Sequence, residues 1–401
     1  MPLPPVVALE VGTSKVVAVV GEMREDGRLL ITGMGEHVSK GVRKGEIVDL
    51  DNAVVCVRGA LHAAEESGQV TIRRVHVAMS GGHIQSHVTR GSSCVLRPDG
   101  EITDVDIEEV IEMAKAVNLP SDREMLHTIC QHFCVDDQQY VTNPRGLTGA
   151  KLTLNMLAVH GVRSRLHNTV KVVHSVPMEV QDVAFSGLCA GLAVLTPEQK
   201  EIGAVVIDLG GGTTSYVAHA DKVLAAAGVI GVGGDHITND ISLAFNISLR
   251  HADLLKLEDG SAVVDPAHRA RRVKVPEEVG FPEQSVGLGA LHIVINARIR
   301  ETLEIIKARL DSCEISSRFG AGVILTGGGA RLGGVADVAA QVFGLPCRIG
   351  RASDVDGLAA AIEGPEYAAA IGMVRYGFSH TAAAEEDVSI TRWIKGLFGR
   401  K

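Results

Sequence analysis

Two segments of the chain place glycine and hydroxyl side chains directly after an apolar strand. The first turn, after an expected strand at 6–11, consists of Gly12, Thr13, Ser14 and Lys15; the second, after an expected strand at 204–209, consists of Gly210, Gly211, Gly212 and Thr213. Glycine lets backbone N–H groups approach an anion closely, and successive N–H groups form a concave anion nest. A single turn of this kind is usually only a hairpin. Two of them predict a duplicated fold that holds one polyphosphate from both sides.

Both strands end in an acidic residue, Glu10 in the first and Asp208 in the second. A carboxylate beside a triphosphate is repelled unless a cation lies between them, so Asp208 predicts Mg²⁺, held partly through water. Lys15 has two interpretations: its side chain neutralises phosphate charge, or it is simply an exposed strand residue. The first is favoured, and the predicted ligand is a polyphosphate with its magnesium ion.

Two further glycine turns complete the set. A strand at 322–325 leads into a turn with Gly327, Gly328, Gly329 and Arg331, and a helix follows from about residue 334. Such a strand-to-helix turn lets a flat nucleoside lie against the backbone and directs a helix N-terminus toward phosphate. Arg331 either stacks on adenine or caps the following helix. The other turn contains Gly233 and Gly234, precedes a helix near His236, and is expected to close over the terminal phosphate.

The bulk composition indicates what kind of fold must position these turns. A chain of 401 residues should form two or more domains and bury a large core. Hydrophobic residues make up 46% and aromatic residues 3%, so that core must be aliphatic. The net charge of −9 argues against nucleic acid as a partner. We see no apolar run long enough for a membrane span and no signal peptide, and therefore expect a cytoplasmic protein.

The seven cysteines, an odd number scattered along the chain, suit reduced thiols rather than a disulfide framework. Four potential metal ligands do lie within eight residues, namely His127, Cys130, His132 and Cys134. Zinc sites usually need paired short spacings from two segments, and no second pair is visible. The alternating pattern of residues 126–135 favours a half-buried strand, and metal binding is the less favoured interpretation.

A compact α+β unit is expected between residues 85 and 165. It begins with a possible strand and a helix from Thr103, where Thr103 and Asp106 form a capping box. Strands at 125–135 and 151–160 follow, joined by a turn at 143–149. The unit interrupts the first half of the duplicated fold.

The last fourteen residues predict an amphipathic helix. Its apolar stripe consists of Ile390, Trp393, Ile394, Leu397 and Phe398, and positive charge off that stripe comes from Arg392, Lys395, Arg400 and Lys401. An apolar face with Trp and Phe beside Lys and Arg suits a helix that lies in a lipid headgroup region. The small, polar and acidic segment 379–387 predicts a flexible tether. The alternative is a helix that docks on its own domain.

Together the turns resemble the actin-like ATPase superfamily, in which a first phosphate loop, a second of the form DLGGGT and an adenosine turn of the form TGGGA occur in this order. Several stretches are similar to one member family, the bacterial cell-division protein FtsA. They are Leu9–Glu22, Lys44–Asp51, His76–Ile84, Asn143–Gly149, Gly233–Phe245 and Val323–Val335. The resemblance implies an α/β, actin-like (ribonuclease H-like) duplicated two-domain fold with an inserted α+β subdomain and a C-terminal amphipathic helix.

The resemblance also implies domain boundaries. The first actin-like subdomain is expected at 1–84 and 166–200 with a return at 361–378, and the inserted subdomain at 85–165. The second actin-like subdomain is expected at 201–240 and 311–360, and a subdomain that closes the nucleotide cleft at 241–310. The linker is expected at 379–387 and the membrane-targeting helix at 388–401.

As a member of this family, the chain is expected to bind ATP and Mg²⁺ and to form filaments with itself. It would anchor FtsZ to an anionic membrane surface at the cytoplasmic face of the inner membrane, at the division septum, and recruit later division proteins. Lys256 matches an adenosine-pocket lysine of the family, although an exposed lysine is nearly as well supported. The alternatives are a small-molecule kinase of the same fold and a scaffold for pilus assembly similar to PilM.

Two departures from the superfamily bear on catalysis. Ser215 stands where the second loop usually has Asp, and residues 185–188 offer no acid where DnaK-type chaperones carry a carboxylate for water activation. General-base help is worth roughly a hundredfold or more in rate. We therefore assign no catalytic residue and expect tight ATP binding with at most slow hydrolysis, unless another part of the fold supplies a carboxylate.

Overall fold

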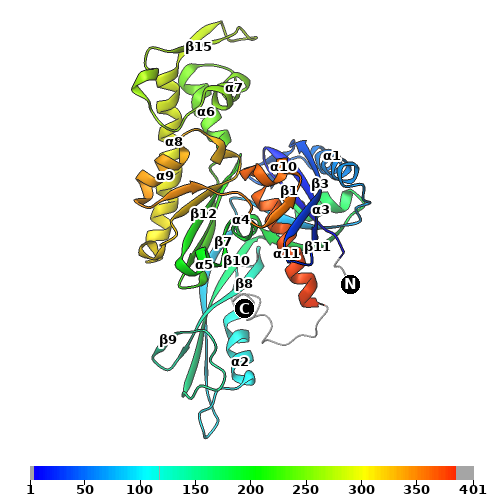
Figure 1. Ribbon diagram of the computed structural model, residues 1–401, viewed down its shortest axis with the longest axis vertical. Helices are drawn as coiled ribbons and strands as arrows, with labels where there is room; N and C mark the ends of the chain where they lie inside the picture. The colour runs from blue at the N-terminus through cyan, green and yellow to red at the C-terminus, as the bar shows by residue number, and fades with distance from the viewer. Residues whose placement is uncertain (1–3, 117, 385–401) are drawn as a thin grey trace.

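The computed structural model describes residues 4–116 and 118–384 of the chain (Figure 1). The predicted membrane-binding helix at 388–401 lies outside the described residues. Its side chains Ile390, Arg392, Trp393, Ile394, Lys395, Leu397 and Phe398 therefore stay a prediction from sequence. Residues 385–387 of the predicted linker also lie outside this range.

The first half of the fold is a six-stranded sheet with the order β11-β6-β1-β2-β3-β19. Strands β1, β2 and β3 form an antiparallel meander, and β6 and β11 then add parallel to β1. The strands are β1 Val6–Val11, β2 Lys15–Met23, β3 Leu29–Val38, β6 Arg74–Met79, β11 Glu179–Phe185 and β19 Val355–Gly357. Helices α1 (Leu50–Gly68) and α3 (Arg163–Ser175) pack on one face.

The second half repeats this plan in a five-stranded sheet with the order β14-β13-β12-β17-β18. Strands β12, β13 and β14 form the meander, and β17 and β18 add parallel to β12. The strands are β12 Ala204–Leu209, β13 Thr214–Ala220, β14 Val223–Ile230, β17 Val323–Thr326 and β18 Cys347–Ile349. The predicted duplicated α/β fold is thus confirmed.

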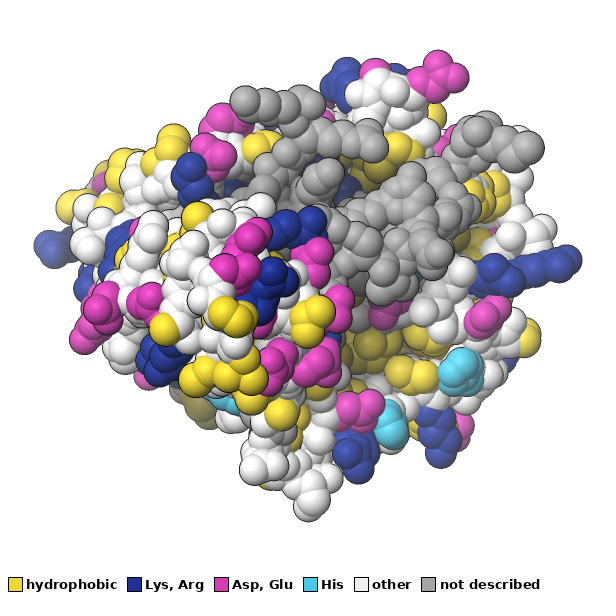
Figure 2. All heavy atoms as spheres, turned by 90° about the horizontal axis from the view of Figure 1, so that it is seen from below, with side chains coloured by type: hydrophobic (Ala, Val, Ile, Leu, Met, Phe, Trp, Pro, Cys, Tyr) yellow, Lys and Arg dark blue, Asp and Glu magenta, His cyan; other side chains and the backbone are white. Residues whose placement is uncertain are grey.

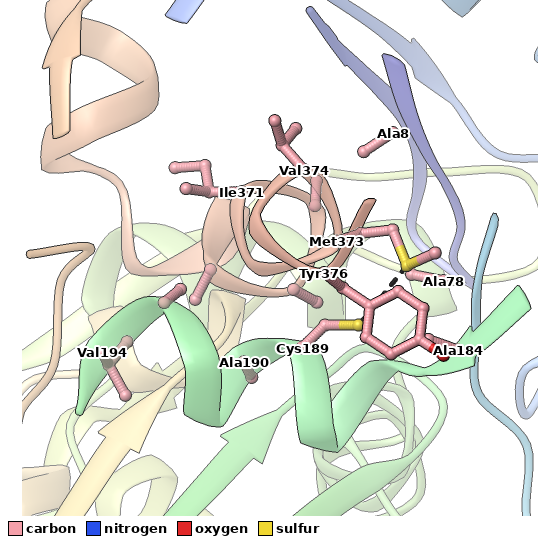
Figure 3. Packing of buried hydrophobic residues seen from close by; sticks show 14 of the residues in the cluster. Ala8, Ala78, Ala184, Cys189, Ala190, Val194, Ile371, Met373, Val374 and Tyr376 are labelled. Atoms are coloured by element: carbon pink, nitrogen blue, oxygen red, sulfur yellow. Dashed lines mark hydrogen bonds between the residues drawn. The ribbon is translucent and has the colours of Figure 1, made fainter. Parts of the chain in front are cut away.

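Two helices lie between the two sheets and join the halves into one core. They are α4 (Ser186–Val194) and α11 (Ala368–Ala384), and their side chains pack with residues of both β1 and β12. Gly372 makes their close approach possible, because a Cβ there would lie 1.7 Å from the carbonyl oxygen of Cys189. Figure 3 shows α4 and α11 packed together, and the Cys189 thiol lies 3.5 Å from the sulfur of Met373.

The inserted subdomain is a four-stranded sheet, β7-β10-β8-β9, with one helix packed on it. Its elements are β7 Gln85–Cys94, α2 Asp104–Lys115, β8 Arg123–Val135, β9 Gln138–Val141 and β10 Lys151–Val162. Thr103 and Asp106 form the predicted capping box at the start of α2. In Figure 1 this subdomain extends downward from the body, away from α6, α7 and β15.

The outer part of the second half is helical. It consists of α6 Gly234–Phe245, α7 Leu249–Asp259 and α8 Leu288–Asp311 with the hairpin β15 Arg272–Val275 and β16 Gln284–Gly287. These elements share one apolar cluster with the face of β12 that carries Ile207. Helix α9 (Val335–Phe343) completes this face.

Short elements connect these units. The hairpin β4 Val42–Arg43 and β5 Glu46–Ile47 precedes α1, and α5 Pro197–Ile202 precedes β12. Helix α10 spans Ala359–Glu363, and single 3₁₀ turns are η1 Pro266–His268, η2 Ser316–Arg318, η3 Gly328–Arg331 and η4 Pro365–Tyr367.

The predicted flexible linker begins too early, because α11 continues to Ala384 and residues 379–384 belong to this helix. Alanine has the highest helix propensity, and three alanines at 382–384 outweigh the polar residues around them. Within residues 4–116 and 118–384, no helix has the length and apolar character needed to cross a membrane.

The end of the molecule that the inserted subdomain forms has a mixed surface. Figure 2 shows acidic, basic and apolar side chains interspersed on this face, without one continuous basic area among the coloured residues. Exposed apolar side chains of the subdomain include Leu96 and Val105.

Candidate functional site

The first two predicted turns have the same geometry. The amide of Gly12 donates to the carbonyl of Lys15 at 3.0 Å, and the amide of Gly210 donates to the carbonyl of Thr213 at 3.0 Å. The turns also abut, since a Cβ on Gly211 would lie 3.1 Å from the Cβ of Ser14. The structure therefore brings the two predicted loops together at the junction of the two halves.

Several amides at this junction have no internal partner. Among the described residues, the backbone N–H groups of Thr13, Ser14, Gly211 and Gly212 donate no hydrogen bond. Backbone amides are strong donors that are usually paired in native structures. Four unpaired amides on two facing turns form the kind of nest that binds an anion.

The hydroxyl groups of both turns contact elements that the sequence analysis did not assign to the site. The Oγ1 of Thr13 accepts a hydrogen bond from the amide of Gly45 at 2.9 Å. The Oγ1 of Thr213 lies 3.0 Å from the Oγ of Ser80, which follows β6. The signal for Ser80 was present, because residues 76–82 repeat the pattern of a strand followed by a hydroxyl residue and glycines.

The amides of the fourth turn are paired within the protein. The amide of Gly234 donates to Gly210 at 3.0 Å, and the amide of Asp235 donates to Gly211 at 2.8 Å. The amide of Gly233 donates to the imidazole Nδ1 of His236 at 3.2 Å. Through these hydrogen bonds Gly233 and Gly234 fix the position of the second turn, and closure over a terminal phosphate stays a prediction.

Glu10 and Asp208 form a carboxylate pair at the junction. Burial, together with the charge of Asp208, raises the pKa of Glu10 to about 8, although Lys15 opposes this shift. Burial raises the pKa of Asp208 to about 6. The Oε2 of Glu10 is buried and has no hydrogen-bond partner within the described part of the chain. Two desolvated carboxylates with an unsatisfied oxygen are a donor set that suits a hard divalent cation.

The third turn meets the second at Asp208. Gly327 has a φ of 82°, and a Cβ there would lie 2.2 Å from the Oδ1 of Asp208. The hydroxyl of Thr326 and the amide of Gly327 both donate to the carbonyl of Pro365, at 2.8 and 3.0 Å. The turn that contains Gly327, Gly328 and Gly329 is thereby held against Asp208.

Arg331 does not cap the following helix, and its stacking on adenine stays a prediction. Its guanidinium forms an ion pair with Glu366 at 2.7 Å, and its side chain is 69% exposed. The start of α9 has no side-chain cap, so Arg331 does not cap that helix.

Lys15 and Lys256 each have a carboxylate partner. The Nζ of Lys15 lies 2.9 Å from Glu36 and 3.9 Å from the centre of the Tyr367 ring. The Nζ of Lys256 lies 2.5 Å from Asp253 and 2.7 Å from the hydroxyl of Thr238. The Lys256 side chain is thus not free in solvent, and it contacts α6, the helix that follows the fourth turn.

Two other predicted features remain, the start of α4 and the His/Cys cluster at residues 127–134. Neither forms a catalytic or metal centre within the described residues. The start of α4, where a water-activating carboxylate would lie, carries Ser186 and Gly187. In the described ranges no three His, Cys, Asp or Glu side chains are placed to hold a metal ion. His127 instead accepts a hydrogen bond from the amide of Phe185 at 2.9 Å, and burial raises the pKa of Cys130 to about 12.

The fold and the site define an actin-like protein with an inserted subdomain. Two solved structures share the fold. One is a PilM–PilN type IV pilus biogenesis complex, with a TM-score of 0.66, 15% identity and coverage of 93% of this chain and 98% of that one. The other is MreB5 of Spiroplasma citri bound to ADP, with a TM-score of 0.55, 15% identity and coverage of 96% and 99%.

Sequence comparison identifies the family. The family described as "Cell division protein FtsA" matches residues 205–372, and "SHS2 domain inserted in FTSA" matches residues 81–160. The chain is 32% identical to the FtsA proteins of Pseudomonas aeruginosa, over 93% of this chain and 89% of that one, and of Escherichia coli, over 98% and 96%. It belongs to the FtsA family of bacterial cell-division proteins.

Proposed function

We propose that the junction of the two halves binds ATP with Mg²⁺. The observation that carries this proposal is the pair of facing turns whose four amides donate to no acceptor among the described residues. The bound magnesium ion would neutralise charge on the phosphates, and Glu10 and Asp208 would hold it, in part through water. The turn at Gly327–Gly329 would receive the nucleoside. The solved MreB5 structure with ADP supports a nucleotide in this fold.

Hydrolysis at this site should be slow. Neither Ser186 nor Gly187, at the start of α4, can act as a general base. Glu10 is nevertheless the carboxylate that the fold brings to the junction from another element. Slow rather than absent turnover is therefore the expected behaviour.

The proposed cellular role follows from the family. The protein would assemble into filaments with further copies of itself at the cytoplasmic face of the inner membrane. There it would anchor FtsZ polymers at the division septum through the amphipathic segment 388–401 and recruit later division proteins. What supports the membrane contact is the sequence of that segment, with its apolar stripe and its basic residues.

Nucleotide binding can be tested by titrating the purified full-length protein with fluorescent ATP, with and without Mg²⁺. Asp208→Asn should weaken binding in the presence of Mg²⁺ and remove most of the magnesium dependence. Asp221→Asn, at an exposed site on the β13–β14 turn, is a matched control. If the wild-type protein bound no nucleotide with Mg²⁺, the proposed site would be wrong.

The tethering role can be tested by co-sedimentation of the protein with FtsZ and anionic liposomes, with and without ATP. We expect FtsZ to sediment with liposomes only when this protein is present. Binding of a short peptide from a pilus membrane protein without FtsZ recruitment would favour a PilM-like scaffold instead. Phosphoryl transfer to a small molecule would favour a kinase.

A further inference from the structure

Three lysines lie around the junction of the two halves, and two of them form ion pairs with carboxylates. Lys15 pairs with Glu36 and Lys256 pairs with Asp253, as described above. The third, Lys44, is exposed and has no ion pair with any residue of the described ranges. Its positive charge is therefore available to a ligand.

The backbone of Lys44 is fixed against the second turn. Lys44 and Gly45 are the two residues that connect β4 and β5, and their φ angles are 51° and 73°. Positive φ at both central residues is what a type I′ hairpin turn requires. A Cβ on Gly212 would lie 2.9 Å from the Cα of Lys44, so the tip of this hairpin touches the second turn.

The side chain of Lys44 extends toward the fourth turn. Its Cδ would lie 3.9 Å from a Cβ on Gly231. Its charge also contributes to lowering the pKa of His236, although burial is the larger cause. A lysine and the N-terminus of α6 both present positive potential here, and such an arrangement is stabilised when an anion lies between them.

We propose that Lys44 binds the terminal phosphate of the nucleoside triphosphate at this junction. The inference rests on the proposed nucleotide site and assigns to Lys44 the phosphate-neutralising role that the sequence pattern predicts for Lys15. Lys44 belongs to the first half of the fold, whereas Gly212 and Gly231 belong to the second. A terminal phosphate held by Lys44 would therefore link the two halves. A nucleotide that lacks this phosphate would link them less well.

The test compares ATP, ADP and AMP binding to the full-length protein and three variants. Lys44→Asn removes the charge with a residue that tolerates positive φ, and Lys44→Arg keeps the charge. Arg43→Gln removes an exposed charge from the neighbouring position and is the matched control. Lys44→Asn should weaken ATP binding by roughly tenfold or more, the scale of one charged hydrogen bond. ADP should be affected less and AMP not at all, and both other variants should stay close to wild type.

A second measurement does not depend on the variants. Acetylation of lysine amines, followed by mass spectrometry, should modify Lys44 in the free protein and much less in the presence of Mg²⁺ and ATP, with AMP giving no protection. Equal ATP affinity of Lys44→Asn and wild type would overturn the assignment, and so would an equal loss for all three nucleotides, which would indicate a structural effect. If the wild-type protein bound no nucleotide at all, this inference and the proposed site would fail together.

Discussion

Gly327 is the residue at which the second and third turns touch. Its φ of 82° and ψ of 171° fall in a region that is essentially restricted to glycine. At Gly328, the next residue, φ is not positive and an added Cβ would have no other atom within 4 Å. Gly327→Ala should therefore destabilise the protein by roughly 2–4 kcal/mol, from backbone strain and displacement of Asp208.

Thermal and urea denaturation of the two alanine variants would measure this difference. Gly328→Ala should change the free energy of unfolding by about 0.5 kcal/mol or less, as for an unhindered site. Equal stability of the two variants would show that the contact between Gly327 and Asp208 does not constrain the turn.

Glu10 should make the stability of the nucleotide-free protein depend on pH. Its pKa is raised from 4.5 to about 8, so the folded state binds this proton more tightly than the unfolded state. The free energy of unfolding should then fall as the pH rises from about 4.5 to 8. Glu10→Gln lacks this penalty and should be more stable than wild type above pH 8, by up to about 5 kcal/mol, with little difference near pH 4.5.

Urea denaturation from pH 4.5 to 8.5 would test this prediction, with the exposed Glu25→Gln as control. A stability gap of the same size at both ends of the range would contradict it. Addition of Mg²⁺ and ATP should narrow the gap, because a cation at Glu10 favours the charged carboxylate.

At the residue level, the sequence predicts which chemical groups the site contains better than it predicts the contacts that each group makes. The glycine turns and the acidic strand ends can be recognised because their chemistry is local. The engagement of Lys15 with Glu36 and Tyr367, and the use of the Gly233 and Gly234 amides inside the protein, depend on contacts between segments that are distant in the chain. Those contacts leave no local pattern.

At the scale of elements, β14 is an edge strand that the inserted subdomain covers. The side-chain amide of Gln131 on β8 donates to the carbonyls of Leu224 and Ala225, at 2.8 and 3.2 Å. The hydroxyl of Ser86 on β7 donates to Ala227 on the same strand. Unpaired strand edges invite association with other chains, and side-chain donors are one way to satisfy them.

Gln131→Ala should therefore cost about 1–2 kcal/mol, because two carbonyls lose their donor. Hydrogen exchange should also quicken in residues 223–230. The matched control is Gln138→Ala on β9, whose side chain is exposed and makes no hydrogen bond with the described residues. Unchanged exchange in β14 of the Gln131 variant would show that the inserted subdomain does not hold this edge.

Elements with strong periodicity or caps are predictable from sequence. The strands 6–11 and 204–209 and the capped start of α2 agree with the structure because each depends on neighbouring residues. The end of α11 is harder to predict, since the polarity of residues 379–384 favours a linker whereas their alanine content favours a helix.

At the scale of the whole molecule, the two halves repeat one topology and share a core through α4 and α11. This arrangement places the glycine turns of both halves at one junction, although they are separated by nearly two hundred residues in the chain. Duplication could be inferred from the repeated strand–turn–strand pattern. The contacts that join the halves, such as Ser80 with Thr213, required the three-dimensional structure.

Membrane binding should depend on assembly rather than on the single chain. Burial of the five large apolar residues of 388–401 yields a few kcal/mol at roughly 25 cal/mol per Å², and ordering the segment consumes part of this. A single chain should therefore leave anionic liposomes readily, whereas a filament that displays many such segments gains by avidity.

Under conditions that promote assembly, the bound fraction should rise steeply with protein concentration. A truncation that ends at Asp387 should remain in the supernatant at every concentration, while the variant Trp393→Phe should bind nearly as wild type. Sedimentation of the truncated chain with vesicles would show that another surface makes the contact.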